Sequence, residues 1–419
     1  MSKISGSSED FKVNFEFRFN PDQNQHDIEL GKRVGLINKF AKQEKRSFPG
    51  VVEFIRLYPV VRAGKSGSEV FYLDIFVKNI NFPKRYIAKF QNVNATIEEG
   101  EAAKNASFAS ICGNVSNVSD RNIDLGILVY DLAKISDHIE FRAYFLDKNY
   151  SDENCGLALT SVYKQIGQHP NEKTDPKSFL QDYDCYLNRR SQPLRRIKSF
   201  INCNQRYKGI SDLAEAINHH YMKIVNKLEN CLVFPYLVHG DLHARNLMLS
   251  VADPTKTELI DFAWVHYGHP AKDFSLMEAT LKYMLLYEFF QKIDRPDNCN
   301  LHMPVVAFER FEQYLCEHIF ELPEINDFEN HMRKTDGILD HHIIGLRRTY
   351  VSLMALRNSA KQILDAYCAE HDRTSGLTSE KHFLISNFLI TFGLSGFPEV
   401  QPIWVLIGLD IIGNSIHQR

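Results

Sequence analysis

One short polar run constrains this chain more than any other feature. Residues 239–246 are His-Gly-Asp-Leu-His-Ala-Arg-Asn, and Asp261 follows Asn246 by fifteen residues, within Ile-Asp-Phe. The apolar residues 233–238 precede the run, which predicts a buried strand that leads into a loop. On such a loop Asp241 can orient a hydroxyl and accept its proton, while Asn246 and Asp261 can hold Mg²⁺ on nucleotide phosphates. The run therefore favours a phosphoryl-transfer site.

The residues between Asn246 and Asp261 predict how the chain returns to this loop. Residues 247–249 and 258–260 are rich in apolar side chains and flank a polar turn that contains a proline. Two such runs around a turn are typical of a β-hairpin. A hairpin would bring Asp261 back beside Asn246, as two ligands of one metal ion require.

Two other interpretations of the loop stay open. A metal ion could be ligated by His239, Asp241 and His243 together. Alternatively, the loop could be structural, with a histidine and an aspartate that form a hydrogen bond with each other. We expect His239 to brace the loop through a backbone hydrogen bond, beside Gly240, which permits a tight turn. A hydrolase site on these histidines would not need Asp261 at its observed spacing, so phosphoryl transfer is favoured.

Composition narrows the class of protein. The 419 residues suit one large two-lobed domain or two ordinary ones, and the formal net charge of −3 gives no reason to expect a nucleic-acid partner. The 8 cysteines include no Cys-x-x-Cys pair, which fits a reducing compartment better than a zinc site or a disulfide framework. The first ten residues lack an apolar core, and no segment nears about 18 uninterrupted apolar residues. We therefore expect a cytoplasmic protein with no membrane partner.

The first third of the chain has the periodicity of a small mixed lobe. Alternating apolar residues predict a strand at 11–19, and helical spacing predicts a helix at 28–45. Three strands with two turns are expected within 51–91, then a helix at 96–108 and a strand at 125–130. These elements predict a nucleotide-clamping N-terminal lobe over residues 1–134.

The remaining residues, 135–419, have mainly helical patterns, so the predicted fold class is α+β with a large helical C-terminal lobe. Helices are expected at 157–168, 211–233, 273–293, 304–321, 338–369 and 379–392, and a buried C-terminal helix at 402–416. Residues 168–198 are polar and include four arginines, which predicts a surface insertion; contact with a phosphate or an acidic substrate is the alternative.

The catalytic run resembles a known family. His-Gly-Asp-Leu-His-x-x-Asn followed by Ile-Asp-Phe is similar to the aminoglycoside phosphotransferase and choline kinase family, a small-molecule branch of the protein-kinase-like fold. Gly240 stands where ordinary protein kinases carry Arg, and His243 stands where they usually carry Lys. The resemblance implies a bilobal protein-kinase-like fold with a small antiparallel sheet in its N-lobe. It also implies that Asp273, which follows Pro-Ala-Lys, braces the catalytic loop.

The same resemblance implies a lysine on a strand that contacts ATP phosphates. Lys89, within Ile-Ala-Lys-Phe, fits that position, and its partner should be a glutamate on the next helix. Glu98, Glu99 and Glu101 are the candidates. We favour Glu101, because the alanines behind it suggest a close-packed inward face; Glu98 is the main alternative.

Two further segments are assigned to the nucleotide by the resemblance. Gly64, Ser66 and Gly67 lie on a turn two strands before Lys89, where backbone N–H groups could approach phosphate oxygens. That stretch is also similar to a bacterial subgroup, the ternary complex associated phosphotransferase domains. Tyr130 and Leu132 would belong to the hinge that binds adenine through its backbone.

These features imply ATP and Mg²⁺ as cofactors and a small-molecule hydroxyl as the acceptor of the γ-phosphate. His243 and the short connection from Asp261 to Asp273 favour a small molecule over a protein, because no recognisable activation segment lies between the two aspartates. Two other classes stay open: a kinase-like modifier of a protein or other macromolecule, and a nucleotide-binding pseudokinase. The identity of the acceptor and the oligomeric state are not predicted.

Overall fold

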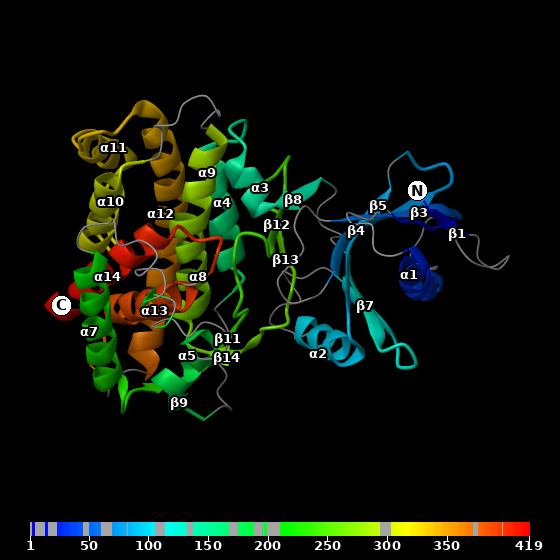
Figure 1. The fold of residues 1–419 in the computed structure, drawn as a ribbon, viewed down its shortest axis with the longest axis horizontal. Coiled ribbons are helices and arrows are strands. Elements are labelled where there is room, and N and C mark those ends of the chain that lie inside the picture. Colours follow the sequence, from blue (N-terminus) through cyan, green and yellow to red (C-terminus); the bar gives the residue numbers. More distant parts are fainter. Residues whose placement is uncertain are drawn as a thin grey trace. The chain divides into compact units, whose positions relative to one another are not determined.

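The chain forms two compact units, seen in a computed structural model that describes residues 2–4, 13–15, 23–44, 50–59, 69–81, 83–104, 114–131, 137–166, 175–187, 195, 197–198, 210–293, 303–371, 376–395 and 397–419. One unit comprises Met1–His138 and Glu258–Ala263, and the other comprises Ile139–Thr257 and Trp264–Arg419 (Figure 1). The first unit thus includes Asp261, which the sequence places far from the N-terminal lobe.

A seven-stranded sheet with the order β1-β2-β3-β4-β5-β7-β6 forms the centre of the first unit. All neighbouring strands are antiparallel except β2 and β3, which are parallel. The strands are β1 Ser2–Ile4, β2 Val13–Phe15, β3 Val52–Pro59, β4 Glu69–Val77, β5 Lys84–Gln91, β6 Asn114–Asp120 and β7 Leu125–Asp131. The three strands predicted within residues 51–91, and the one predicted at 125–130, are confirmed.

The helices of this unit are α1 Gln23–Gln43 and α2 Val93–Ala103. The side chains of Leu36, Ile37 and Phe40 on α1 share one apolar core with Ala88 and other sheet residues. Because side chains alternate across a strand, Lys89 points to the opposite face of the sheet, where it meets α2.

Two predictions for the first unit need correction. The helix predicted over residues 96–108 begins at Val93, where the Asn92 side chain accepts a hydrogen bond from the amide of Ala95, and it ends at Ala103. Strand β6, at the sheet edge, was not predicted, because residues 114–120 carry only two apolar side chains. Much of the strand predicted at 11–19, and residues 105–113, lie outside the described residues.

The second unit is mainly helical, as predicted. Its helices are α3 Phe141–Leu146, α4 Asp152–Tyr163, α5 Phe179–Leu187, α7 Ile210–Leu228, α8 Ala271–Thr280, α9 Leu286–Ile293, α10 Val305–Glu317, α11 Ile325–Arg333, α12 Asp340–His371, α13 Ser379–Leu394 and α14 Pro402–Gln418. A π-helical turn, Leu281–Leu285, joins α8 to α9, and the amide of Leu286 donates to the carbonyl of Leu281. Helix α14 is largely buried, which confirms the buried C-terminal helix.

Short strands flank the loop of residues 239–246 and Asp261. They are β8 His138–Glu140, β9 Lys177–Ser178, β10 Leu232–Val233, β11 Tyr236–Val238, β12 Leu247–Ser250, β13 Thr257–Leu259 and β14 His266–Gly268. Strands β12 and β13 are neighbours in a three-stranded sheet with the order β13-β12-β8, which confirms the predicted hairpin.

The interpretation of residues 168–198 as a surface insertion is wrong for the described part of that segment. Helix α5 lies within it and buries Phe179, Asp182, Tyr183 and Leu187. Of the four arginines of the segment, only Arg195 is described, and its side chain is exposed.

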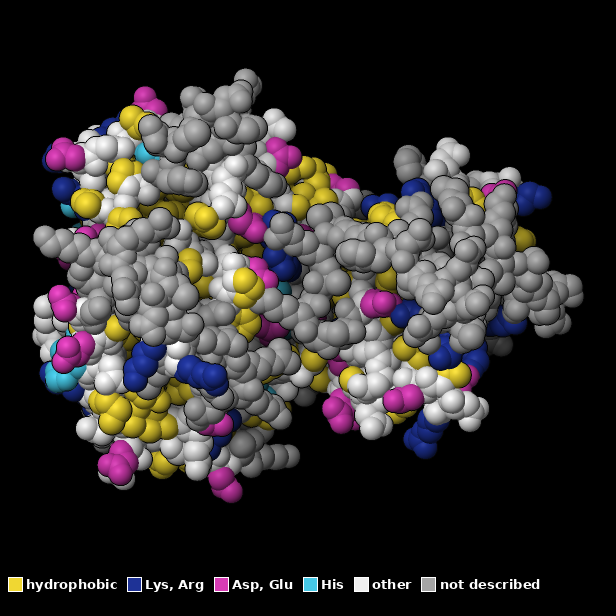
Figure 2. Space-filling view, in the orientation of Figure 1, with side chains coloured by type: hydrophobic (Ala, Val, Ile, Leu, Met, Phe, Trp, Pro, Cys, Tyr) yellow, Lys and Arg dark blue, Asp and Glu magenta, His cyan; other side chains and the backbone are white. Residues whose placement is uncertain are grey.

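On the face shown in Figure 2, basic and acidic side chains are interspersed among the described residues, in keeping with the small net charge. None of the helices in the described ranges is both long and apolar enough to cross a bilayer.

Candidate active site

Lys89 is held by two carboxylates within the first unit. Its Nζ lies 2.7 Å from Oε2 of Glu99 on α2 and 2.7 Å from Oδ1 of Asp261, which follows β13. The side chains of Lys89 and Glu99 are 3% and 1% exposed, whereas that of Asp261 is 29% exposed. Burial alone would lower the pKa of Lys89, but the charges of Asp261 and Glu99 outweigh burial and raise it. The lysine therefore stays protonated.

The partner of Lys89 is Glu99, so the prediction of Glu101 is wrong. Helix α2 buries Val93, Thr96, Glu99, Gly100 and Ala103, and this stripe faces the sheet. The side chain of Glu101 is exposed, because it lies two residues past Glu99 and each residue turns the helix by about 100°. Glu98, the alternative, is not in the buried stripe either.

Glu99 is itself fixed by two more groups. The hydroxyl of Tyr130 donates to its Oε1, and Nε2 of Gln91 donates to its Oε2 at 2.9 Å. Tyr130 lies on β7 between β5 and β6, so its backbone groups belong to the sheet. A base-binding hinge would therefore begin after β7; Leu132 and the turn with Gly64, Ser66 and Gly67 lie outside the described residues.

Asp261 has a left-handed backbone. Its φ is 64°, a conformation that non-glycine residues seldom adopt outside functional sites and turns. The following Phe262 is buried and lies beside Tyr130, with ring centroids 6.1 Å apart. The strained peptide and the buried ring fix the carboxylate next to Lys89.

The predicted catalytic loop, residues 239–246, lies in the second unit and is fixed by Asp273 of α8. The amide of His239 donates to Oδ2 of Asp273 at 2.8 Å, and the amide of Gly240 donates to Oδ1 at 2.9 Å. This confirms the bracing role that the resemblance implied for Asp273. Complete burial raises the pKa of Asp273 to about 6, although the two amide donors act in the opposite direction.

Gly240 is required by its backbone and its surroundings. Its φ is 77°, and a Cβ at this position would lie 2.3 Å from the carbonyl oxygen of Trp264 and 2.9 Å from Nδ1 of His266. His239 is fully buried, and its Nδ1 accepts a hydrogen bond from the amide of Asp241 at 3.4 Å. The predicted bracing role of His239 is confirmed.

Asp241 presents an accessible carboxylate from this fixed loop. Its side chain is 35% exposed, and Oδ2 lies 3.8 Å from Nε2 of His243. A carboxylate that must meet an incoming hydroxyl needs such exposure. His243 is also partly exposed and its Nδ1 accepts from the amide of Arg245, which stabilises the turn of the loop.

Asn246 has its amide group oriented by the same loop. Its Nδ2 donates to the carbonyl oxygen of Asp241 at 2.8 Å, which leaves Oδ1 as the atom that can bind a cation. This oxygen and the partly exposed carboxylate of Asp261 are ligands of the type that Mg²⁺ prefers. Among the described residues, no group of three or more His, Cys, Asp or Glu side chains could hold a metal ion.

Sequence reasoning missed residues of α5 that contact the loop. The hydroxyl of Tyr186 donates to the carbonyl oxygen of Gly240 at 2.6 Å, and Asp182 forms an ion pair with Lys272 at 2.7 Å. Neither contact has a signal in the local sequence, because the partners are at least 54 residues apart.

Comparison with known proteins places this site in a family context. Residues 158–283 match the model of the ecdysteroid kinase-like family. The matched segment extends from α4 to the π-helical turn and contains Asp241, Asn246, Asp261 and Asp273. No curated protein matches the chain significantly.

The solved structures to which this chain is similar are distant in sequence. A thermostable mutant of aminoglycoside phosphotransferase APH(4)-Ia, in ternary complex with ADP and hygromycin B, is 9% identical, with 86% of this chain and 93% of that chain covered and a TM-score of 0.41. A putative aminoglycoside phosphotransferase from Ralstonia eutropha is 11% identical, with coverages of 88% and 99% and a TM-score of 0.38. An ethanolamine kinase from Plasmodium vivax is 10% identical, with coverages of 94% and 89% and a TM-score of 0.39.

These superpositions are too loose to transfer any residue's role, so the chemistry of the site rests on the chain's own side chains. The family match covers the catalytic loop, its bracing aspartate and the predicted metal aspartate together. It confirms the predicted resemblance to the protein-kinase-like group. Over residues 158–283, the chain is similar to the ecdysteroid kinase-like family.

Proposed function

We propose that this chain is an ATP-dependent phosphotransferase that moves the γ-phosphoryl group of ATP to a hydroxyl of a small molecule. The contact of Lys89 with both Glu99 and Asp261 carries the proposal. A lysine that two carboxylates keep protonated and fixed can contact the oxygens of a nucleotide phosphate. The match to a kinase-like family supports phosphotransferase chemistry.

Asp241 is proposed to act on the acceptor. Its carboxylate orients the hydroxyl and takes its proton as the acceptor oxygen bonds to the γ-phosphorus. The bond from this phosphorus to the β,γ-bridging oxygen breaks, and ADP leaves with that oxygen. The proton then passes from Asp241 to solvent.

Asn246 and Asp261 are proposed to hold Mg²⁺, which when bound neutralises charge on the transferring phosphate. Lys89 is proposed to contact phosphate oxygens, with Glu99 fixing its side chain. Gly64, Ser66, Gly67, Tyr130 and Leu132 stay predictions for the nucleotide, with Tyr130 acting through Glu99.

The test is phosphate transfer from labelled ATP with Mg²⁺, scored separately in a metabolite extract and in a protein extract. Label should enter small molecules. Asp241→Asn should abolish transfer and leave binding of Mg·ATP largely intact, because the carboxylate acts on the acceptor. Asp253→Asn, the same change in the exposed turn between β12 and β13, is the matched control and should transfer normally.

Other outcomes would replace the proposal. Label confined to proteins would make the chain a modifier of macromolecules. Binding of ATP without transfer to either pool would make it a pseudokinase. Near-normal turnover by Asp241→Asn would show that the mechanism is wrong.

A further inference from the structure

The peptide plane that precedes Asp241 is bound at both of its polar atoms. The carbonyl oxygen of Gly240 accepts from the hydroxyl of Tyr186 at 2.6 Å, and the amide of Asp241 donates to Nδ1 of His239. Both atoms belong to one rigid unit, because the peptide bond is planar. These two hydrogen bonds, at opposite edges of the peptide plane, set the direction in which the Asp241 side chain leaves the backbone.

Tyr186 is well suited to hold this plane. Burial keeps the pKa of its hydroxyl well above the ordinary value, so the hydroxyl remains a donor. Its ring lies beside that of Trp264, with centroids 6.5 Å apart, and beside Nζ of Lys272 at 5.7 Å. The ring is therefore confined by neighbours while its hydroxyl reaches the loop.

Helix α5 is anchored one turn before Tyr186. Oδ2 of Asp182 pairs with Nζ of Lys272 at 2.7 Å, and both side chains are fully buried. Nζ of Lys272 also donates to the carbonyl oxygen of Asp182 at 2.6 Å. Residues four apart lie on one helix face, so the anchor and Tyr186 point to the same side of α5.

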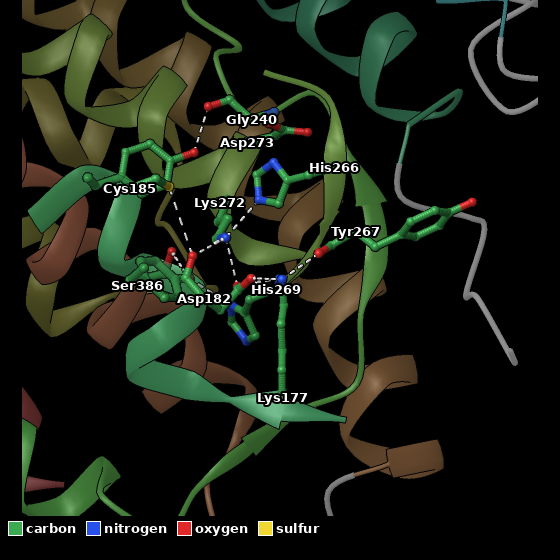
Figure 3. Close-up of polar contacts among 12 residues, drawn as sticks. Lys177, Asp182, Cys185, Gly240, His266, Tyr267, His269, Lys272, Asp273 and Ser386 are labelled. Carbon is green, nitrogen blue, oxygen red and sulfur yellow. Dashed lines mark hydrogen bonds and ion pairs between the residues drawn. The ribbon is translucent and has the colours of Figure 1, made fainter. Parts of the chain in front are cut away.

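The anchor extends to the segment against which Gly240 packs. Nζ of Lys272 lies 2.9 Å from Nε2 of His266, and Nδ1 of His266 lies 2.7 Å from the carbonyl oxygen of Trp264. A carbonyl can only accept, so Nδ1 carries the proton and Nε2 accepts from the lysine. Figure 3 shows Lys272 between His266 and Asp182.

We infer that Tyr186, on helix α5, is a positioning residue for Asp241. The inference rests on the proposed function, because it assigns Tyr186 the task of aiming the carboxylate that receives the acceptor hydroxyl. Asp182, Lys272 and His266 hold the two surfaces between which the Gly240 peptide lies.

Tyr183 provides a matched comparison on the same helix. Its hydroxyl donates to Oγ of Ser386 at 2.8 Å and lies 2.8 Å from Nδ1 of His269. Tyr183→Phe and Tyr186→Phe each remove one buried hydroxyl from α5. Only the second removes a hydrogen bond to the catalytic loop.

The experiment measures hydrolysis of Mg·ATP by the full chain, in which water takes the place of the acceptor. Tyr186→Phe should lower kcat by about 10- to 100-fold, the scale expected when a reacting group is misplaced by about 1 Å, and leave KM for ATP within about twofold. Tyr183→Phe should change kcat by less than about threefold. Hydrogen exchange of a peptide spanning residues 236–246 should accelerate only in Tyr186→Phe.

Unchanged kcat and unchanged loop exchange in Tyr186→Phe would overturn the inference. Equal losses of kcat in both variants, with equal losses of melting temperature, would reduce Tyr186 to a packing role and also overturn it. If the unmodified chain does not hydrolyse ATP, label transfer in the metabolite extract still decides the proposed function, and the exchange comparison still decides whether Tyr186 holds the loop.

Discussion

Lys89 Nζ lies 2.7 Å from Oδ1 of Asp261, although 172 residues separate the two in the sequence. The contact brings the aspartate after β13 into the same compact unit as the N-terminal sheet. It is also the place where bound phosphates would compete, because their oxygens and the carboxylate of Asp261 attract the same ammonium group. Glu99 also binds the lysine, so Lys89 would keep one carboxylate partner if Asp261 bound a metal ion instead.

Glu99→Gln should raise KM for ATP about tenfold and destabilise the first unit by about 1–3 kcal/mol. The neutral amide removes a charge from Lys89 and leaves Tyr130 or Gln91 with a poorer acceptor. Nucleotide titration and thermal unfolding measure the two effects. Glu101→Gln is the matched control on the same helix and should match the unmodified chain; equal effects of the two substitutions would contradict the assignment of Glu99.

Gly240→Ala should destabilise the second unit by about 2–4 kcal/mol and sharply reduce turnover, because the new methyl group adds a clash with Trp264 to the cost of a positive φ. Gly376→Ala is the control that measures the cost of a positive φ without a clash. Gly376 has a φ of 67° and open space around it, so its alanine variant should lose only about 1 kcal/mol and keep its activity. Similar losses in both variants would show that the contact with Trp264 is unimportant.

Turnover should fall as the pH drops below about 6, where Asp273 becomes protonated. A protonated carboxyl is a weaker acceptor for the amides of His239 and Gly240, so the loop loosens. Asp273→Asn should have a lower kcat at every pH, and its kcat should no longer fall below pH 6. The measurement is kcat as a function of pH from 5 to 8. An acidic limb that persists in the variant would belong to another group.

His266 should make the second unit less stable in mild acid. Burial and the charge of Lys272 lower its pKa from 6.5 to about 4 in the folded state. As the pH falls, the unfolded chain therefore binds the proton before the folded chain does. The stability that His266 contributes is complete above pH 6.5 and is lost as the pH falls toward 4, at about 1.4 kcal/mol per pH unit. Asp273 acts with the opposite sign between pH 3.8 and about 6, because its folded pKa is raised.

The contribution of His266 to this pH dependence is measured by comparing His266→Gln with the unmodified chain. His266→Gln cannot titrate, so its free energy of unfolding should depend less on pH between 6.5 and 4 than that of the unmodified chain. Both tryptophans of the chain, Trp264 and Trp404, lie in the second unit, so their fluorescence during urea unfolding reports on that unit. Parallel pH profiles for the two proteins would refute the role assigned to His266.

The local structure around Asp241, Asn246 and Asp261 was predictable from their spacing, whereas their catalytic and metal-binding roles stay predictions. Asp241, Asn246 and Asp261 need a loop and a hairpin of definite length, and the hairpin β12–β13 forms as expected. The bracing by Asp273 followed from the same motif. Lys89 was predictable from its strand, whose apolar neighbours alternate with it.

The wrong and missing predictions have a different cause. Glu101 was favoured because alanines follow it, but Ala103 lies one turn beyond Glu99, so the buried alanine marks the face of Glu99. Tyr186 and Asp182 lie in a polar stretch, and their partners are Gly240 in the loop after β11 and Lys272 in α8. Contacts of this kind are decided by tertiary packing, and no local periodicity encodes them.

The π-helical turn between α8 and α9 has a consequence for length changes in the chain. Such a turn holds one residue more than an α-helical turn, so α9 continues α8 with its phase shifted by about 100°. That shift directs Glu288 to its ion pair with Arg142 and buries Phe289 and Phe290. Deleting a single residue from Leu281–Leu285 would restore regular winding and rotate all three side chains away from their partners. The length of this stretch is therefore fixed by partners that lie outside it.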